Sequence, residues 1–417
     1  EKSGQAGLAI LKSFLARSFN KCSGEGGNDQ AVAAVDASAS SSCSSSSLSS
    51  SSSSVTTTTT LARRIVACLD VRSNDNGDLV VTKGDQYDVR EESSAGAADA
   101  ALSAPDDITI TGNTGAVRNL GKPRDLAARY YNEGADEIVF LNITSFRSSP
   151  VGDMPLLELL RQTSATVFVP LTIGGGIRDY TDMDGKVWTA LDVAGRYFRA
   201  GADKVSIGSD AVAAAAALIA AAKAKGASTP LTDASLKTGT SSIEQISNQY
   251  GAQAVVVSVD PRRAFIADAE GKAAHEAQGH TVFDAPADAS TPDGMSYMWY
   301  QCTVRGGREG SAVGAVQLGR AVQALGAGEL LCNCVNADGQ KAGFELPLLR
   351  TLSAAVSIPV IASSGAGCAA HFEEVFRETQ VTAALAAGIF HRREVPISEV
   401  KRFLREDVSK GGGVHIR

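Results

Sequence analysis

The chain lacks any apolar run near the roughly 18–20 residues that a membrane-spanning helix needs, so no membrane span is expected. It also lacks a dense basic stripe, and its net charge of −7 leaves neither nucleic acid nor an anionic membrane surface as an obvious partner. Its five histidines form no ligand pattern, and the one-residue gap between Cys332 and Cys334 suits neither a zinc site nor a redox pair. We therefore expect no metal and no other cofactor. The seven cysteines, an odd number with several in apolar runs, indicate a reducing compartment.

The length of 417 residues is enough for two or three average domains, or for one large barrel with insertions. Residues 38–60 are almost entirely Ser and Thr, a composition that cannot bury a core and is typical of a flexible linker. We therefore divide the chain into a leading segment (1–20), a low-complexity Ser/Thr-rich linker (21–60) and a main body (61–417). Because the chain begins at Glu1 and not at Met, we expect a fragment with any targeting peptide out of view. The expected location is soluble and intracellular, in the plastid for a plant or alga and otherwise in the cytoplasm.

In the main body, apolar runs of strand length alternate with amphipathic stretches, which indicates a parallel α/β architecture. The strand-like runs are residues 65–70, 137–142, 167–173, 204–207, 254–260, 329–335, 358–363 and 383–387. The amphipathic stretches include residues 124–133, 191–200, 243–249, 316–325 and 371–378. Eight strands with interleaved helices predict a (β/α)8 TIM barrel, whose active sites lie at the C-terminal ends of the strands. A doubly wound sheet is the alternative, but it predicts fewer strands.

Three stretches rich in Ala, Ser, Gly and Asp interrupt this pattern, near residues 91–117, 222–242 and 264–296. They show no apolar period. We expect each to form a solvated loop insertion with little bearing on the core.

The signals at the ends of the strands occur twice, which predicts a barrel with a twofold internal repeat. Asp70 ends the run Val-Ala-Cys-Leu-Asp, and Asp260 ends the run Val-Val-Ser-Val-Asp. The separation from Asp70 to Gly174 equals that from Asp260 to Ser364. A carboxylate at the end of a buried strand is costly unless it is paired or used, and strands one and five face each other across a barrel mouth. The two aspartates are therefore candidate acid–base residues, although a single such Asp can equally cap a loop.

Glycine-rich turns follow strands three, four, seven and eight. Glycine lets backbone amides approach an anion closely, and a helix that starts after the turn adds partial positive charge. Two pairs of such turns predict two phosphate sites, and hence a small molecule with a phosphate at each end. Lys83, on the loop after strand one, could reach over the mouth, or it could be an ordinary solvated lysine. The residues expected to bind substrate or phosphate are Lys83, Gly174, Gly175, Gly208, Ser209, Asp338, Gly339, Ser363, Ser364, Gly365, Ala387 and Gly388.

Four charged residues stand at the starts of strands. They are Arg64, Glu137, Lys204 and Glu329. Two cations and two anions that converge at the bottom of a barrel could pair and plug it, because buried charges persist only when they are paired. Separate surface charges are the alternative that spacing alone leaves open.

At these residues the sequence closely resembles the cyclase part of imidazole glycerol phosphate synthase, a family of histidine biosynthesis. The matching runs are residues 63–71, 134–137, 174–178, 201–207, 326–329 and 386–391. The runs Tyr-Gln-Cys-Thr at 300–303 and Gly-Gly-Arg-Glu at 306–309 look like the eukaryotic, bifunctional form. The resemblance implies that phosphoribulosyl-formimino aminoimidazole carboxamide ribonucleotide and ammonia give imidazole glycerol phosphate and aminoimidazole carboxamide ribotide.

The same resemblance assigns roles. Asp70 and Asp260 would be the general acid–base residues, and the four charged strand-start residues would gate ammonia from a glutaminase, fused upstream or separate. The segment Glu1-Lys2-Ser3-Gly4 looks like the end of the glutaminase signature His-Pro-Glu-Lys-Ser, which would make Glu1 the last member of a Cys/His/Glu triad. Because the Cys and His of that triad are absent, this chain alone should not hydrolyse glutamine.

Two positions depart from the family pattern. Asn336 stands where the family usually has Asp, and Ser364 stands where it has Gly. Two alternatives therefore remain. One is the related isomerase that makes the substrate of the cyclase, and the other is a non-catalytic barrel that docks a glutaminase, for which Asn336 is the best support.

Overall fold

The computed structural model describes residues 62–74, 78–82, 119–143, 154–182, 184–226, 228–287, 290–409 and 414–417. The chain divides into two units, 1–58 and 59–417, and all described residues belong to the second. The expected insertion at 91–117 lies outside the described residues.

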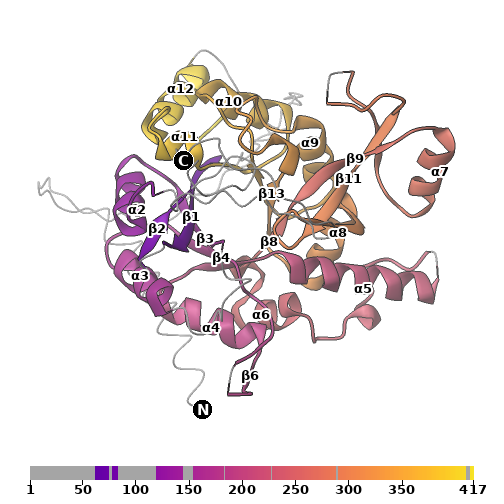
Figure 1. Cartoon of the computed structure of the whole chain (residues 1–417), viewed down its shortest axis with the longest axis horizontal. Coiled ribbons are helices and arrows are strands. Elements are labelled where there is room, and N and C mark those ends of the chain that lie inside the picture. The colour runs from indigo at the N-terminus through magenta and orange to yellow at the C-terminus, as the bar shows by residue number, and fades with distance from the viewer. Residues whose placement is uncertain are drawn as a thin grey trace, which may run out of the picture. The chain divides into compact units, whose positions relative to one another are not determined.

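Eight parallel strands form a closed barrel in the described part of the chain, which confirms the predicted fold (Figure 1). The strands are β1 (Arg64–Ser73), β3 (Glu137–Asn142), β4 (Leu171–Gly174), β7 (Lys204–Ile207), β8 (Val255–Val259), β13 (Glu329–Asn333), β14 (Val360–Ser363) and β15 (Ala383–Ala386). They pair in chain order, and β15 pairs with β1 to close the ring. A short strand, β2 (Leu79–Val81), adds antiparallel to β1, and β5 (Tyr180–Thr181) pairs with β6 (Val187–Trp188) in a separate hairpin.

Two apolar clusters explain why these runs form a barrel. One lies between strands and helices and contains most of the buried side chains of the unit. The other contains Val66, Cys68, Val139, Val256, Leu331, Ile361, Ala383 and Leu385, which all belong to barrel strands. Because successive side chains of a strand point to opposite faces, apolar residues on both faces are what a strand buried on both sides requires.

Helices surround the barrel strands (Figure 1). They are α2 (Pro123–Asn132), α3 (Met154–Ser164), α4 (Ala190–Ala200), α5 (Ser209–Lys225), α6 (Ser242–Tyr250), α8 (Ala315–Leu325), α9 (Leu346–Ala355), α10 (Ala369–Glu378), α11 (Gly388–His391) and α12 (Ile397–Ser409). α4 illustrates how local sequence sets their ends. The Thr189 side chain accepts a hydrogen bond from the backbone of Asp192 at the start, and Gly201 ends the helix at a φ of 112°.

The expectation of a solvated loop near 264–296 was wrong, whereas the structure agrees with most of the one near 222–242. Residues 222–225 form the last turn of α5 and Ser242 begins α6, but residues 228–241 form turns with one short 3-10 helix (Ala234–Leu236) and are largely exposed. The stretch near 264–296 contributes to a separate antiparallel sheet of β9 (Pro261–Ile266), β10 (Val282–Asp284), β11 (Tyr297–Val304) and β12 (Glu309–Gly314), together with α7 (Ala269–Ala277). This sheet follows directly from β8, and Figure 1 shows it beside the barrel with α7 at its outer edge.

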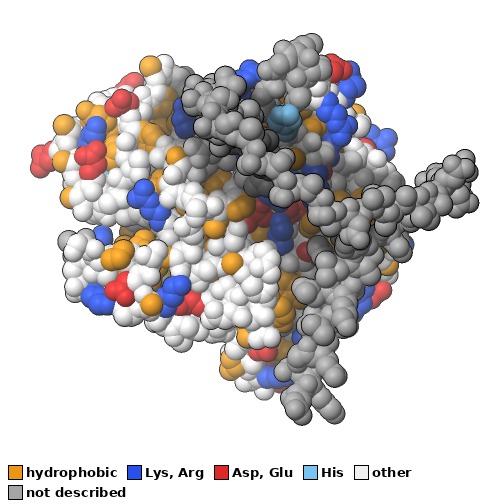
Figure 2. Space-filling view, turned by 180° about the vertical axis from the view of Figure 1, so that it is seen from behind, with side chains coloured by type: hydrophobic (Ala, Val, Ile, Leu, Met, Phe, Trp, Pro, Cys, Tyr) orange, Lys and Arg blue, Asp and Glu red, His pale blue; other side chains and the backbone are white. Residues whose placement is uncertain are grey.

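No helix among the described residues is both long enough and apolar enough to span a bilayer. Lys and Arg side chains are interspersed with Asp and Glu on the face that Figure 2 shows, as far as the described residues cover it. That mixture agrees with a protein that holds charged ligands by local groups.

Candidate active site

A cavity of about 710 Å³ opens at the C-terminal ends of the barrel strands. Each of the eight strands contributes at least one residue to its wall. The volume falls within the roughly 300–1,000 Å³ that is usual for small-molecule sites.

Of the 14 residues predicted to be catalytic or to bind substrate, 13 line this one cavity. They are Asp70, Asp260, Gly174, Gly175, Gly208, Ser209, Asp338, Gly339, Ser363, Ser364, Gly365, Ala387 and Gly388. Lys83 lies outside the described residues. The residues predicted at the strand ends therefore form much of the wall of the cavity, and the role of each residue remains a prediction.

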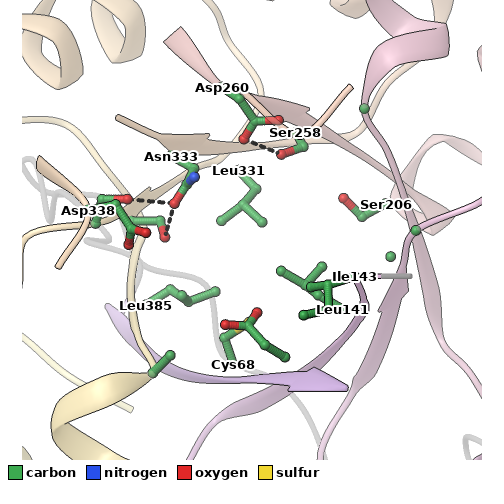
Figure 3. A pocket seen from close by; sticks show the side chains of 18 of the residues that line it. Cys68, Leu141, Ile143, Ser206, Ser258, Asp260, Leu331, Asn333, Asp338 and Leu385 are labelled. Atoms are coloured by element: carbon green, nitrogen blue, oxygen red, sulfur yellow. Dashed lines mark hydrogen bonds between the residues drawn. The ribbon is translucent and has the colours of Figure 1, made fainter. Parts of the chain in front are cut away.

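The two aspartates stand on the first and fifth strands of the ring, which are opposite positions of an eight-stranded barrel. Asp70 lies within β1, and the thiol Sγ of Cys68 is 3.9 Å from its Oδ1. Asp260 follows β8, and the Ser258 hydroxyl donates to its Oδ1 at 2.9 Å. Figure 3 shows Asp260 and Cys68 on opposite sides of the cavity, with its open space between them.

Asp260 has a shifted proton affinity. Burial raises the pKa of its carboxyl group to about 6, the charge of Asp338 adds to this, and hydrogen bonds from Ser258 and Asn333 oppose it. Its carboxylate is therefore mostly ionised at neutral pH but close enough to its pKa to exchange protons.

One side of the cavity is formed by the turns after β4 and β7. Gly175 and Gly176 have φ values of 98° and 75°, a region of backbone space that favours glycine. α5 begins at Ser209 directly after Gly208, so its N-terminal amides lie at the cavity. The Ser209 hydroxyl accepts a hydrogen bond from the backbone N–H of Arg305 at 2.9 Å.

The opposite side is formed by the turns after β14 and β15. Gly365 has a φ of 93°, and a Cβ at this position would lie 2.0 Å from the carbonyl oxygen of Gly343. Ser364 has a φ of 72°, which is unusual for a residue with a side chain. Its hydroxyl donates to Asn333 Oδ1 at 2.5 Å, so the position of the expected glycine carries a hydrogen bond instead.

Sequence reasoning missed several residues of the wall. Ser258 and Asn333 lie inside predicted strands, and Ser258 shares a strand face with Asp260, a signal that was available. The basic side chains of the wall are Arg72, Arg178, Arg305, Arg308, Lys341 and Arg392. Arg305 and Arg308 come from the turn between β11 and β12, which the sequence did not reveal as a hairpin. These cations supply the local positive charge that an anionic ligand needs in an acidic protein.

Asn336 is not part of the wall. Its Oδ1 accepts a hydrogen bond from the backbone N–H of Arg263 at 2.7 Å and thus connects the turn after β13 to β9. Asp338, two residues on, does line the cavity. An amide oxygen can accept this bond as a carboxylate oxygen can, and the side chain lies outside the cavity wall, so the departure at position 336 does not change the lining of the cavity.

The four charged residues at the strand starts do converge, as predicted. Lys204 Nζ is 2.8 Å from Glu137 Oε2 and 2.7 Å from Glu329 Oε2. Arg64 bonds Glu137 Oε2 at 2.8 Å and also pairs with Glu329. Thr172 donates to the remaining oxygen of Glu137 at 2.7 Å. These contacts form a closed ring at the end of the barrel opposite the cavity, and the alternative of separate surface charges was wrong.

Residues 64–396 match the family model described as histidine biosynthesis protein. The chain is 53% identical over 352 residues to "Imidazole glycerol phosphate synthase hisHF, chloroplastic" of Arabidopsis thaliana, covering 83% of this chain and 52% of the relative. It is 49% identical to the hisHF protein of Emericella nidulans over 406 residues, which are 97% of this chain and 63% of that relative. It is also 34% identical to "Imidazole glycerol phosphate synthase subunit HisF" of Haloarcula marismortui over 82% of this chain and 96% of the subunit. The chain thus spans less than two thirds of the hisHF relatives and matches nearly the whole length of the HisF subunit.

Proposed function

Because the chain belongs to the histidine biosynthesis protein family, we propose that its barrel carries the cyclase activity of imidazole glycerol phosphate synthase. The reaction joins ammonia to phosphoribulosyl-formimino aminoimidazole carboxamide ribonucleotide and releases imidazole glycerol phosphate and aminoimidazole carboxamide ribotide. One observation carries the proposal most strongly. Two carboxylates on opposite strands line a single cavity that has glycine-rich turns on both sides.

In this proposal Asp70 and Asp260 transfer protons during ammonia addition, bond cleavage and ring closure. A pKa of about 6 lets Asp260 accept a proton at neutral pH and return it. The turns after β4 and β7 hold one phosphate, and those after β14 and β15 hold the other, so that the reacting part of the substrate lies between the carboxylates.

The ring of Arg64, Glu137, Lys204 and Glu329 is proposed to gate ammonia. Its members close the barrel end opposite the cavity, and the apolar interior cluster includes Val66 and Leu331 on the strands that connect the two ends. Neutral ammonia enters an apolar interior far more readily than ammonium, because an unpaired charge is costly there. The passage therefore favours delivery of the neutral nucleophile.

We further propose that the ammonia comes from a glutaminase domain, either fused upstream or separate. The hisHF names of the relatives that extend beyond this chain support the fused form. One of those names includes the word chloroplastic, which supports a plastid location if this chain comes from a plant or alga.

An assay with two nitrogen sources tests the function. The purified chain should turn over the bis-phosphorylated substrate with an ammonium salt, and it should be inactive when glutamine replaces ammonium. Asp260→Asn should lower kcat by about 10²–10⁴-fold and leave substrate binding nearly unchanged. Asn336→Ala, whose side chain lies outside the cavity, is the matched control with wild-type kcat. A folded wild-type chain that gives no product with ammonium would rule out the cyclase.

A further inference from the structure

The side chain of Asn333 links parts of the cavity that are distant in the sequence. It ends β13, which lies between β8 and β14 in the sheet. Its Oδ1 accepts hydrogen bonds from the hydroxyls of Ser363 at 3.2 Å and Ser364 at 2.5 Å (Figure 3). Its side chain is also hydrogen-bonded to the carboxylate of Asp260, which follows β8.

These partners determine how the amide is oriented. A carboxamide has one oxygen that accepts and one NH2 group that donates. Since two hydroxyl donors occupy the oxygen, the NH2 group is left to face Asp260, and only this group can donate to a carboxylate. An ionised Asp260 requires this orientation, and in it both serine hydroxyls donate to the amide oxygen and hold it in place.

The backbone at Ser364 supports a specific use of its hydroxyl. Ser364 has a φ of 72°, a backbone conformation that glycine adopts without strain and that is strained for serine. A glycine at this position would lack the short hydrogen bond that the Ser364 hydroxyl donates to Asn333. The strained serine is thus explained by the amide that it holds.

Few charged groups compete with Asn333 at Asp260. Among the described residues, the titratable side chains that affect this carboxylate or are affected by it are Asp338, Cys302 and Cys332. Burial raises the pKa of both thiols, so they stay neutral, and Asp338 favours protonation of Asp260. The hydrogen bonds from Asn333 and Ser258 are therefore what favours the ionised form.

We propose that Asn333 is a positioning residue that orients Asp260 and keeps it ionised, and that Ser363 and Ser364 hold Asn333 in the required orientation. The inference rests on the proposed acid–base role of Asp260 only for its consequence in catalysis. It also connects the turn proposed to bind the second phosphate with the group proposed to move the proton, through one amide.

Carboxyl NMR tests the proposal without turnover. In protein labelled with ¹³C at the Asp side-chain carboxyl carbons, the resonance lost in Asp260→Asn identifies Asp260, and its titration gives the pKa. We expect a midpoint near 6 in the wild type. Asn333→Leu should raise it by about one pH unit, the effect of losing one charge-assisted hydrogen bond. Asn333→Thr, which restores a short donor, should recover part of that shift, and Asn336→Ala should leave the midpoint unchanged.

A double-mutant comparison tests the part played by Ser364. Ser364→Ala alone should raise the Asp260 midpoint by less than Asn333→Leu does. Added to Asn333→Leu it should have no further effect, whereas added to Ser258→Ala it should add its full shift, because Ser258 reaches Asp260 directly. If Asn333→Leu fails to fold, Ser364→Ala still tests the proposal, because it removes only one hydroxyl group. An unchanged midpoint in Ser364→Ala and in every folded variant at Asn333 would overturn the proposal.

Turnover then separates this inference from the proposed function. With ammonium as the nitrogen source, the acid limb of the pH profile of kcat/KM should lie about one pH unit higher in Asn333→Leu than in the wild type. The substitution should change kcat more than KM. A wild type without turnover refutes the function while the NMR result stands. If the wild type is active and the acid limb of Asn333→Leu lies at the same pH as that of the wild type, the positioning role alone is refuted.

Discussion

Replacing Asp260 by Asn should stabilise the protein while it removes activity. Asp260 lies where its carboxylate is mostly surrounded by protein, and burial raises its pKa to about 6 from the roughly 3.9 of an exposed aspartate. The folded chain therefore holds an ionised group that the unfolded chain would solvate better. Asparagine keeps the size of the side chain and has no charge to bury.

The magnitude follows from the difference between the two pKa values. About two pKa units correspond to about 3 kcal/mol, and the contact of Asp260 with the open cavity reduces this to about 2 kcal/mol. Between about pH 4 and pH 6 the folded state binds more protons than the unfolded state, so the free energy of unfolding falls as pH rises. Above about pH 6 the cost of the charge is complete. Asp260→Asn should match the wild type near pH 4 and exceed it by about 2 kcal/mol at pH 7.5.

Urea unfolding at a series of pH values measures this difference, with fluorescence and circular dichroism compared to check for a single transition. Asp182→Asn is a control of opposite sign, because hydrogen bonds from Trp188 and the backbone of Lys186 lower the pKa of Asp182. That substitution should cost stability at neutral pH, and the cost should vanish as pH falls below the pKa of Asp182. The reasoning about Asp260 is refuted if Asp260→Asn is less stable than wild type at pH 7.5, or if the difference does not change between pH 4 and 7.

Two further substitutions probe the ring and the second turn. Glu137 is 1% exposed and accepts hydrogen bonds from Arg64, Lys204 and Thr172. Glu137→Gln should therefore lower the free energy of unfolding by about 3–5 kcal/mol, which a lower Tm would show. An unchanged Tm would mean that the ring contributes no stability. Gly365→Ala places a methyl group 2.0 Å from a carbonyl oxygen, so the turn must move, and KM for the phosphorylated substrate should rise about tenfold or more. Gly239→Ala is the control for backbone strain alone, because Gly239 has a φ of 70° and open space around it, and this variant should keep the wild-type KM.

The barrel strands were predictable because each is buried on both faces and reads as a continuous apolar run. The error at the third strand has a simple cause. The predicted run 167–173 contains Pro170, which has no N–H to donate to a ladder, and the strand begins at Leu171. The wall of the cavity was predictable for a related reason, since a barrel brings the ends of all its strands to one face.

The extra sheet could not be predicted from local pattern. α7 has no buried residue, so its sequence carries no apolar period that would indicate a helix. β11 is held on one side by β9 and on the other by β10 and β12, partners that only the fold brings together. For the same reason Arg305 and Arg308 were missed, because they reach the cavity only through the turn of that sheet.

The departures from the twofold repeat distinguish the two aspartates. The residue two positions before Asp70 is Cys68, whose thiol lies 3.9 Å away, whereas the residue two positions before Asp260 is Ser258, whose hydroxyl donates at 2.9 Å. Thiols are weak donors, so the equivalent contact is stronger in the second half. The second half also has serine at 364, directly after β14 with a φ of 72°, where the first half has Gly175 directly after β4 with a φ of 98°, and glycine has no hydroxyl with which to fix a neighbouring amide. Equivalent backbones thus surround the carboxylates with different donors, and two carboxylates in unlike environments can serve as acid and base in one reaction. The repeat places the pair, and its imperfections give each member its own chemistry.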